Sequence, residues 1–232
     1  MLRILLAGLL VIGTASCSDS GSETVSKYND PITVVNNGKS GDNTKMLLSR
    51  VNDMERIKFD VSILLVGTND TINWGGGQIK QDNYLANLKA LANKLSSNSK
   101  ELIIMTIPPA IEEDVLKKFP DGHFDSYGSV NSKINTYNNI VIDVANEFNA
   151  QLFNLNNMIY KESGINKTSA TYFLDDGVHL NEQAYKALAK QLYKKIAPLK
   201  PNSVGCFGDS LTFGYSVNKS YPEYLSEKLN NH

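Results

Sequence analysis

Two short polar segments carry the side chains best suited to nucleophilic catalysis. Ser210 lies in "GDSL", directly after an apolar run, and Asp176 and His179 lie in "DDGVHLN", just before a helical pattern. A serine hydroxyl is a weak nucleophile at neutral pH, and a histidine can take its proton on attack and return it to the leaving group. Asp176 is close enough in a turn to hydrogen-bond the other imidazole nitrogen and fix its tautomer. These residue types predict hydrolysis by an activated serine.

Two further segments follow predicted strands, "GKSGD" with Gly41 and "GTND" with Asn69. Taken singly, all four segments are common turns and helix caps. A glycine at position 41 would let the backbone approach a substrate closely. The function prediction depends on the four segments occurring together.

Together these segments resemble the sequence blocks of the SGNH (GDSL-type) hydrolase superfamily. The resemblance extends over nearly everything from Ile32 to His232 and includes "TIPP" at 106–109. It implies that Ser210 is the nucleophile, His179 the base and Asp176 its orienting partner. It also implies an oxyanion hole made by the backbone N–H groups of Ser210 and Gly41 and the side-chain amide of Asn69.

Short apolar runs alternate with segments in which apolar residues recur at helical spacing, which indicates βα units. Strands are predicted at Ile32–Val35, Val61–Val66, Leu102–Ile107, Gln151–Leu155 and Val204–Phe207. Runs such as "VSILLV" are typical of parallel strands covered on both faces. The expected fold is a three-layer α/β/α, flavodoxin-like sandwich with a five-stranded parallel sheet, whose ligands bind at the carboxyl ends of the strands.

The order of the segments departs from the family, in which the serine block comes first. Here it follows the glycine, Asn and Asp-His blocks, and only Tyr215 to His232 come after "GDSLTFG". Joining the two ends of the chain would restore the usual order, which indicates a circular permutation. The C-terminal strand Val204–Phe207 is then expected in the centre of the sheet, between the strands at Ile32 and Val61.

Composition and charge limit the class of protein. The chain has 232 residues, of which 41% are hydrophobic and 20% charged, which suits one domain, placed at residues 31–232. The formal net charge of −1, without a basic stripe, excludes a nucleic-acid partner. The three histidines offer no metal-ligand spacing, so we expect neither a metal nor a cofactor. Cys206 lies in an apolar stretch and is expected to be a buried hydrophobe.

The N-terminal residues predict export. Residues 1–17 combine Arg3, an apolar run and small residues before Cys17, which resembles a bacterial lipoprotein signal with Cys17 as the lipidated residue. The alternative is ordinary secretion with cleavage nearby. Residues 18–30 are polar and Ser-rich, as in a flexible tether. The expected location is the cell envelope, on the periplasmic or cell-surface side of a bacterial membrane.

The predicted function is a serine esterase that removes short acyl groups, acetyl in particular, from carbohydrate or other small polar substrates. Trp74, with Gly75 and Gly76, is a candidate for the rim of the substrate cleft, where its ring would stack on a sugar; core packing is the alternative for Trp74. One alternative function is a lysophospholipase or thioesterase that acts on longer acyl chains. The other is a lipoprotein that binds glycans without catalysis.

Overall fold

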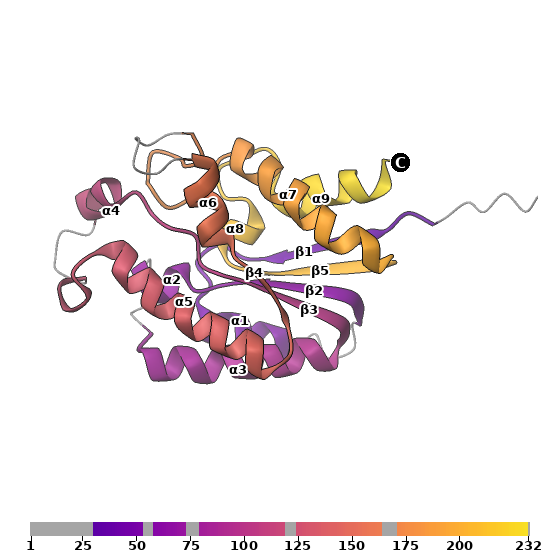
Figure 1. Ribbon diagram of the computed structural model, residues 1–232, viewed down its shortest axis with the longest axis horizontal. Helices are drawn as coiled ribbons and strands as arrows, with labels where there is room; N and C mark the ends of the chain where they lie inside the picture. Colours follow the sequence, from indigo (N-terminus) through magenta and orange to yellow (C-terminus); the bar gives the residue numbers. More distant parts are fainter. Residues whose placement is uncertain (1–29, 53–57, 73–78, 119–123, 164–170, 232) are drawn as a thin grey trace, which may run out of the picture.

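The computed structural model of this chain describes residues 30–52, 58–72, 79–118, 124–163 and 171–231. These residues form three layers, with a parallel sheet between two layers of helices (Figure 1). The predicted α/β/α class is therefore confirmed. None of the helices in the described part of the chain is long and apolar enough to cross a membrane.

The sheet has five strands in the order β1-β5-β2-β3-β4, and all neighbouring strands are parallel. Their bounds are β1 Thr33–Gly38, β2 Phe59–Leu65, β3 Ser99–Met105, β4 Gln151–Phe153 and β5 Ser203–Gly208. The last strand lies inside the sheet, between β1 and β2, because Val204 pairs with Val34 of β1 on one side and with Val61 of β2 on the other. The predicted central position of the C-terminal strand is confirmed.

The predicted strand ends differ from the observed ones by up to three residues, and the end of β4 shows a physical reason. The strand that was expected to reach Leu155 ends at Phe153, and Leu155 is the first residue of a helix. The side chain of Asn154 accepts a hydrogen bond from the backbone of Asn157 at 2.8 Å, as an N-cap does, so α6 begins at Leu155, where the strand was expected to continue.

Long helices cover both faces of the sheet (Figure 1). One face carries α1 Thr44–Asn52, α3 Gln81–Ser97 and α5 Val130–Glu147, and the other carries α6 Leu155–Ser163, α7 Glu182–Ile196 and α9 Tyr221–Asn230. Shorter helices lie in the connections: α2 Thr68–Ile72, α4 Glu112–Lys118, α8 Ser210–Phe213, and the 3₁₀ turns η1 Asp125–Tyr127 and η2 Ala197–Leu199.

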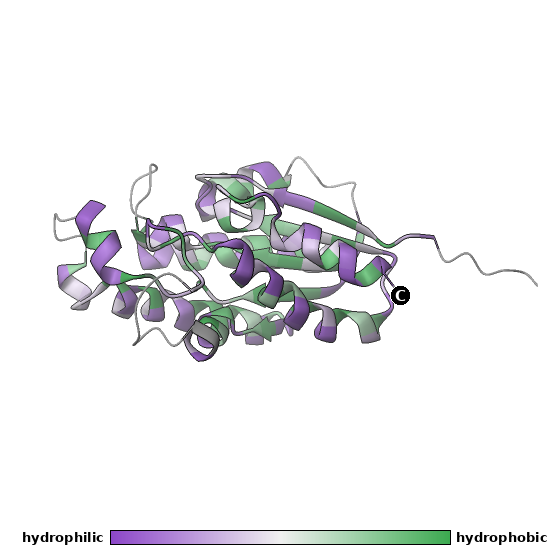
Figure 2. Ribbon diagram, turned by 90° about the horizontal axis from the view of Figure 1, so that it is seen from above, coloured by the Kyte–Doolittle hydropathy of each residue, from purple (hydrophilic) through white to green (hydrophobic). Residues whose placement is uncertain are grey.

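Each strand contributes to two hydrophobic cores, because successive side chains point to opposite faces. In β2, Val61, Ile63 and Leu65 pack in the core beneath α7 and α9, whereas Leu64, which alternates with them, packs in the core beneath α1, α3 and α5. Figure 2 shows the hydrophobic residues gathered on the strands and hydrophilic residues along the helices. The continuous apolar runs therefore reflect burial on both faces.

The last helix closes against the first strand. The side chain of Asn230 accepts a hydrogen bond from the backbone N–H of Ile32 at 2.7 Å and donates one to the carbonyl of Ile32 at 3.0 Å. The start of α9 is fixed by a capping box between Ser220 and Glu223, with Pro222 in the first turn. The two ends of the described chain are thus adjacent in space.

Lys133 of α5 is a buried charge for which the described residues provide no hydrogen bond. Its side chain is 1% exposed, and Nζ has no hydrogen-bond partner among the described residues. The ammonium lies 5.4 Å from the ring centroid of Phe124 and 5.5 Å from that of Tyr127. Burial lowers the pKa of Lys133 to about 8. Removing the charge should therefore stabilise the fold.

We expect Lys133→Met to raise the free energy of unfolding at pH 7 by about 1 kcal/mol, since an unsatisfied buried charge costs more than cation–π contacts return. The melting temperature would rise by about 2–4 °C. Between pH 8 and 10 the folded state releases the lysine proton before the unfolded state does, so wild-type stability gains and the advantage of Met shrinks. Thermal melts of both proteins at pH 7, 8.5 and 10 measure this, and a variant less stable than wild type at pH 7 would contradict it.

Candidate active site

All four polar segments meet at the carboxyl ends of the strands. Ser210 starts α8 directly after β5, Gly41 follows β1, and Asn69 lies in α2 after β2. Asp176 and His179 lie in the loop before α7. This is the edge at which open parallel sheets bind ligands, so the structure places every described candidate residue where a site is expected.

The three candidate catalytic side chains form a continuous hydrogen-bonded line. Nε2 of His179 lies 2.9 Å from Oγ of Ser210, and Nδ1 of His179 lies 2.6 Å from Oδ2 of Asp176. Ser210 is 5% exposed and His179 is 6% exposed. A serine, a base and a group that orients the base therefore lie in hydrogen-bond contact, largely shielded from water.

The carboxylate of Asp176 is held on both oxygens. Its Oδ1 accepts hydrogen bonds from the backbone N–H groups of Val178 at 2.9 Å and His179 at 2.8 Å, while Oδ2 contacts the imidazole. Burial alone would raise the pKa of Asp176, but the hydrogen bonds from His179 and Val178 outweigh it and hold that pKa well below its usual range. Asp176 is therefore ionised throughout the neutral range and keeps the proton of His179 on Nδ1.

The loop that carries this pair is a tight hairpin. Phe173 and Leu180 form an antiparallel bridge, and the backbone of Leu174 donates to the carbonyl of His179 at 2.8 Å. Gly177 turns the chain at φ 71°, a left-handed conformation that favours glycine. The short Asp-to-His spacing therefore suffices because both side chains project from one folded-back loop.

The candidate oxyanion groups are joined to each other. Gly41 adopts φ 85°, which only glycine tolerates easily. The carbonyl of the next residue, Asp42, accepts a hydrogen bond from Nδ2 of Asn69 at 2.8 Å. Because this bond links the segment after β1 to the segment after β2, it fixes the orientation of the Asn69 amide.

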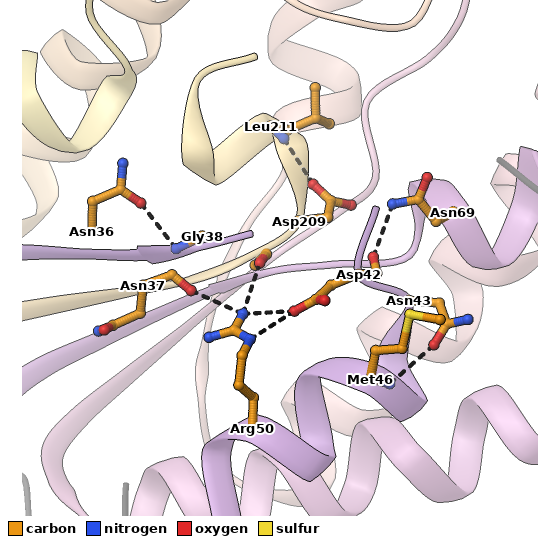
Figure 3. A network of polar contacts seen from close by, with 11 residues as sticks. Asn36, Asn37, Gly38, Asp42, Asn43, Met46, Arg50, Asn69, Asp209 and Leu211 are labelled. Carbon is orange, nitrogen blue, oxygen red and sulfur yellow. Dashed lines mark hydrogen bonds and ion pairs between the residues drawn. The ribbon is translucent and has the colours of Figure 1, made fainter. Parts of the chain in front are cut away.

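Arg50 of α1 anchors Asp42, the residue that follows Gly41 (Figure 3). Its Nη2 lies 2.7 Å from Oδ2 of Asp42 and donates to the carbonyls of Asn37 at 3.1 Å and Gly208 at 3.4 Å. One guanidinium thereby connects the Gly41 loop to the ends of β1 and β5. Sequence reasoning missed Arg50; its only signal was a charged residue within the apolar helical pattern "MLLSRV".

The turn that presents Ser210 needs a glycine before it. A Cβ added at Gly208 would lie 2.1 Å from the carbonyl oxygen of Leu65 and 2.3 Å from Oγ1 of Thr212. Asp209 then caps α8, because its Oδ1 accepts a hydrogen bond from the backbone of Leu211 at 2.9 Å. Close packing at Gly208 and helix capping by Asp209 therefore explain the two residues before Ser210 without reference to catalysis.

Two buried carboxyl groups lie beneath the site. Both oxygens of Asp70 accept hydrogen bonds from the backbone of Thr44, and burial raises the pKa of Asp70 to about 6. Oδ2 of Asp209 has no hydrogen-bond partner in the described part of the chain. Burial, together with the charges of Asp70 and Asp42, raises the pKa of Asp209 to about 7.

A cleft of about 660 Å³ opens beside Asp176. It is called the Asp176 cleft here, and its lining combines aromatic, aliphatic, charged and neutral polar side chains: Lys118, Phe173, Leu174, Asp175, Asp176, Asn181, Tyr215 and Ser216. It is therefore suited to a polar ligand with an apolar face.

The remaining sequence predictions concern residues outside the four polar segments. Trp74, Gly75, Gly76 and Cys17 lie outside the described residues. Cys206 is fully buried, and burial raises the pKa of its thiol to about 12, as expected for a structural cysteine. Across the described ranges, no group of three or more His, Cys, Asp or Glu side chains is placed to hold a metal ion.

Solved structures with the same fold come from bacterial hydrolases. An acetylxylan esterase from Geobacillus stearothermophilus is 21% identical, with a TM-score of 0.52 and coverage of 68% of each chain. A GDSL-like lipase from Bacteroides thetaiotaomicron is 20% identical, with a TM-score of 0.53, covering 68% of this chain and 73% of that one. A lipase/acylhydrolase from Enterococcus faecalis is 19% identical, with a TM-score of 0.51, covering 68% and 72%. No curated protein matches the sequence.

The model of the GDSL-like Lipase/Acylhydrolase family matches residues 14–187. The matched range contains Gly41, Asn69, Asp176 and His179 and ends before Ser210. Since most of the sequence matches the family and the described residues have the fold of its solved members, the chain belongs to the GDSL-like Lipase/Acylhydrolase family and is a carboxylic ester hydrolase.

Proposed function

We propose that this chain is a serine esterase in which Ser210, His179 and Asp176 form the catalytic triad. The observation that carries the proposal is the line of contacts from Oγ of Ser210 to Nε2 of His179, at 2.9 Å, and from Nδ1 to Asp176, at 2.6 Å. This is the arrangement by which an imidazole activates a hydroxyl on many unrelated folds.

In the proposed reaction, Oγ of Ser210 attacks the ester carbonyl carbon while Nε2 of His179 takes its proton. The tetrahedral intermediate collapses, the bond to the alcohol oxygen breaks, and the imidazolium returns the proton to that oxygen. Water, deprotonated by the same nitrogen, then attacks the acyl-serine carbonyl; the bond to Oγ breaks, the imidazolium returns the proton to Oγ of Ser210, and the carboxylic acid is released. Ionised Asp176 stabilises the imidazolium in both steps.

The oxyanion of each intermediate would be bound by the backbone N–H groups of Ser210 and Gly41 and by the Asn69 amide. One hydrogen of Nδ2 of Asn69 is used by the Asp42 carbonyl, and the second is the one proposed to face the substrate. The Arg50–Asp42 ion pair supports this role because it holds the Gly41 loop in place before substrate binds.

The proposed substrates are esters of short acyl groups, acetyl in particular, with carbohydrates or other small polar alcohols. The fold shared with an acetylxylan esterase supports this choice. Charged and amide side chains in the Asp176 cleft, including Lys118, Asp175 and Asn181, also favour a polar substrate. A lysophospholipase or thioesterase activity on longer acyl chains is the competing candidate, because the family includes lipases.

We further propose that the chain is a circular permutation of the family order. The strand that leads to Ser210 is last in the sequence but lies between β1 and β2. The family match ends before that strand, and the contacts between Asn230 and Ile32 bring the last helix to the first strand. The lipid anchor at Cys17 and the cell-envelope location stay predictions from the sequence.

A panel of p-nitrophenyl esters from acetyl to palmitoyl tests the esterase proposal. We expect the highest kcat/KM for acetyl and a loss of about 10⁶-fold in kcat for Ser210→Ala. Asp176→Asn should lose about 10⁴-fold, because the imidazole then adopts the wrong tautomer. Ser97→Ala, at an exposed position of α3, is the matched control and should retain wild-type rates.

Two results of that panel would contradict the proposal. A preference for acyl chains of eight carbons or more would favour the lysophospholipase or thioesterase. Negligible rates that do not differ between the wild type and Ser210→Ala would favour a non-catalytic binding protein.

The permutation predicts that the family order can be restored. In the proposed variant, His232 is joined to Asp30 by about six Gly/Ser residues, which span about 13 Å, and the new chain runs from Lys200 to Leu199. We expect it to melt cooperatively and to keep Ser210-dependent activity, because the cut lies between η2 and β5 and the joined ends are adjacent.

The matched control uses the same linker but places the new ends between Leu64 and Leu65, inside β2, and should fail to fold. Loss of folding in both variants would count against the permutation.

A further inference from the structure

Tyr215 lies against the candidate catalytic histidine and is still open to solvent. Its ring centroid is 4.4 Å from that of His179, with an angle of 35° between the planes. Tyr215 is 44% exposed, whereas His179 is buried. One face of the tyrosine ring is therefore used by the imidazole, and the remainder of the side chain is available to a ligand.

The backbone around Tyr215 is turned sharply to bring it there. Gly214 has φ 92° and Ser216 has φ 57°, so left-handed residues stand on both sides of the tyrosine. The backbone N–H of Tyr215 donates to the carbonyl of Ser210 at 3.1 Å, which folds the segment back over the start of α8. A left-handed serine costs about 1–2 kcal/mol, and such strained positions gather at functional sites.

The chemistry of ester cleavage determines which part of the substrate meets Tyr215. The leaving alcohol oxygen must lie within hydrogen-bond distance of Nε2 of His179 to receive its proton. The alcohol portion therefore leaves along the imidazole, on the side where Tyr215 and the Asp176 cleft lie. The acyl group and its oxyanion belong on the opposite side, near Gly41 and Asn69.

The Asp176 cleft has the composition of a sugar-binding surface. Tyr215 supplies an exposed flat ring, and Asp175 and Lys118 supply charged groups beside it. A pyranose or furanose presents C–H groups on its faces and hydroxyl groups at its edge, so it matches a ring platform with a polar rim. A fatty alcohol has no ring hydroxyl groups to hydrogen-bond to the charged groups of this lining.

We propose that Tyr215 is a specificity-determining residue that stacks on a sugar ring in the alcohol portion of the ester, within the Asp176 cleft. This inference rests on the proposed esterase function. It gives Tyr215 the stacking role that the sequence suggested for Trp74. The exposed face of the Tyr215 ring would contact the sugar, and the opposite face lies against His179.

Steady-state kinetics with two acetyl esters test the assignment. For a partially acetylated xylooligosaccharide, Tyr215→Ala should raise KM about 10-fold, as expected for the loss of one aromatic stacking contact. For ethyl acetate, which has no ring, kcat/KM should stay within about twofold of the wild-type value. Tyr215→Trp should restore the KM for the oligosaccharide.

Phe213→Ala is the matched control, because Phe213 is 53% exposed on the same segment but does not line the Asp176 cleft. Phe213→Ala should leave kcat and KM unchanged for both esters. An equal fall in kcat for both esters in Tyr215→Ala would mean that Tyr215 only orients His179, and it would overturn the assignment. An unchanged KM for the oligosaccharide would overturn it too.

A binding measurement separates this inference from the esterase proposal. Titration calorimetry with unacetylated xylotetraose should show binding to Ser210→Ala and about 10-fold weaker binding to Ser210→Ala/Tyr215→Ala. If the wild type hydrolyses neither ester, the esterase proposal fails while this difference still supports the platform. Equal affinities, or no binding to either protein, would overturn the platform whatever the rates.

Discussion

The parallel pairing of β5 with both β1 and β2 is the constraint on which the rest of the structure depends. Val204 pairs with strands on both sides, and at the end of the strand Gly208 packs so closely against Leu65 that no side chain would fit. Because β5 is central, Ser210 emerges between the segment that carries Gly41 and the segment that carries Asn69. The geometry of the site follows from the position of one strand.

The buried carboxyl groups beneath the site help to order it, but burying them costs electrostatic free energy. Asp42, Asp70 and Asp209 are all buried, and Arg50 forms an ion pair with Asp42. The raised pKa values of Asp70 and Asp209 report the cost of keeping these carboxyl groups away from water. In return, the bond from Asn69 to Asp42 at 2.8 Å joins the segments after β1 and β2, and Arg50 joins Asp42 to Gly208 at the end of β5, which suits a site that must be ordered before substrate arrives.

Much of the fold was predictable because its signals are local. Apolar runs identified the five strands, and the segments with catalytic residue types identified the edge at which the site lies. The end of β4 was misplaced because the capping bond of Asn154 competes with the apolar pattern. Arg50 and Tyr215 could not be found from sequence, since their significance comes from partners, Gly208 and His179, that only the folded chain brings near.

The late position of β5 in the sequence also bears on how the protein acquires its structure. Thr33, at the start of β1, pairs with Ser203, so the first strand must wait for almost the whole chain before its neighbour exists. Pairings of such long sequence separation form slowly, because the entropy of closing the loop is lost before any contact compensates for it. A nascent chain that has not yet reached β5 cannot complete its sheet, because β1 and β2 then lack the strand that pairs with both.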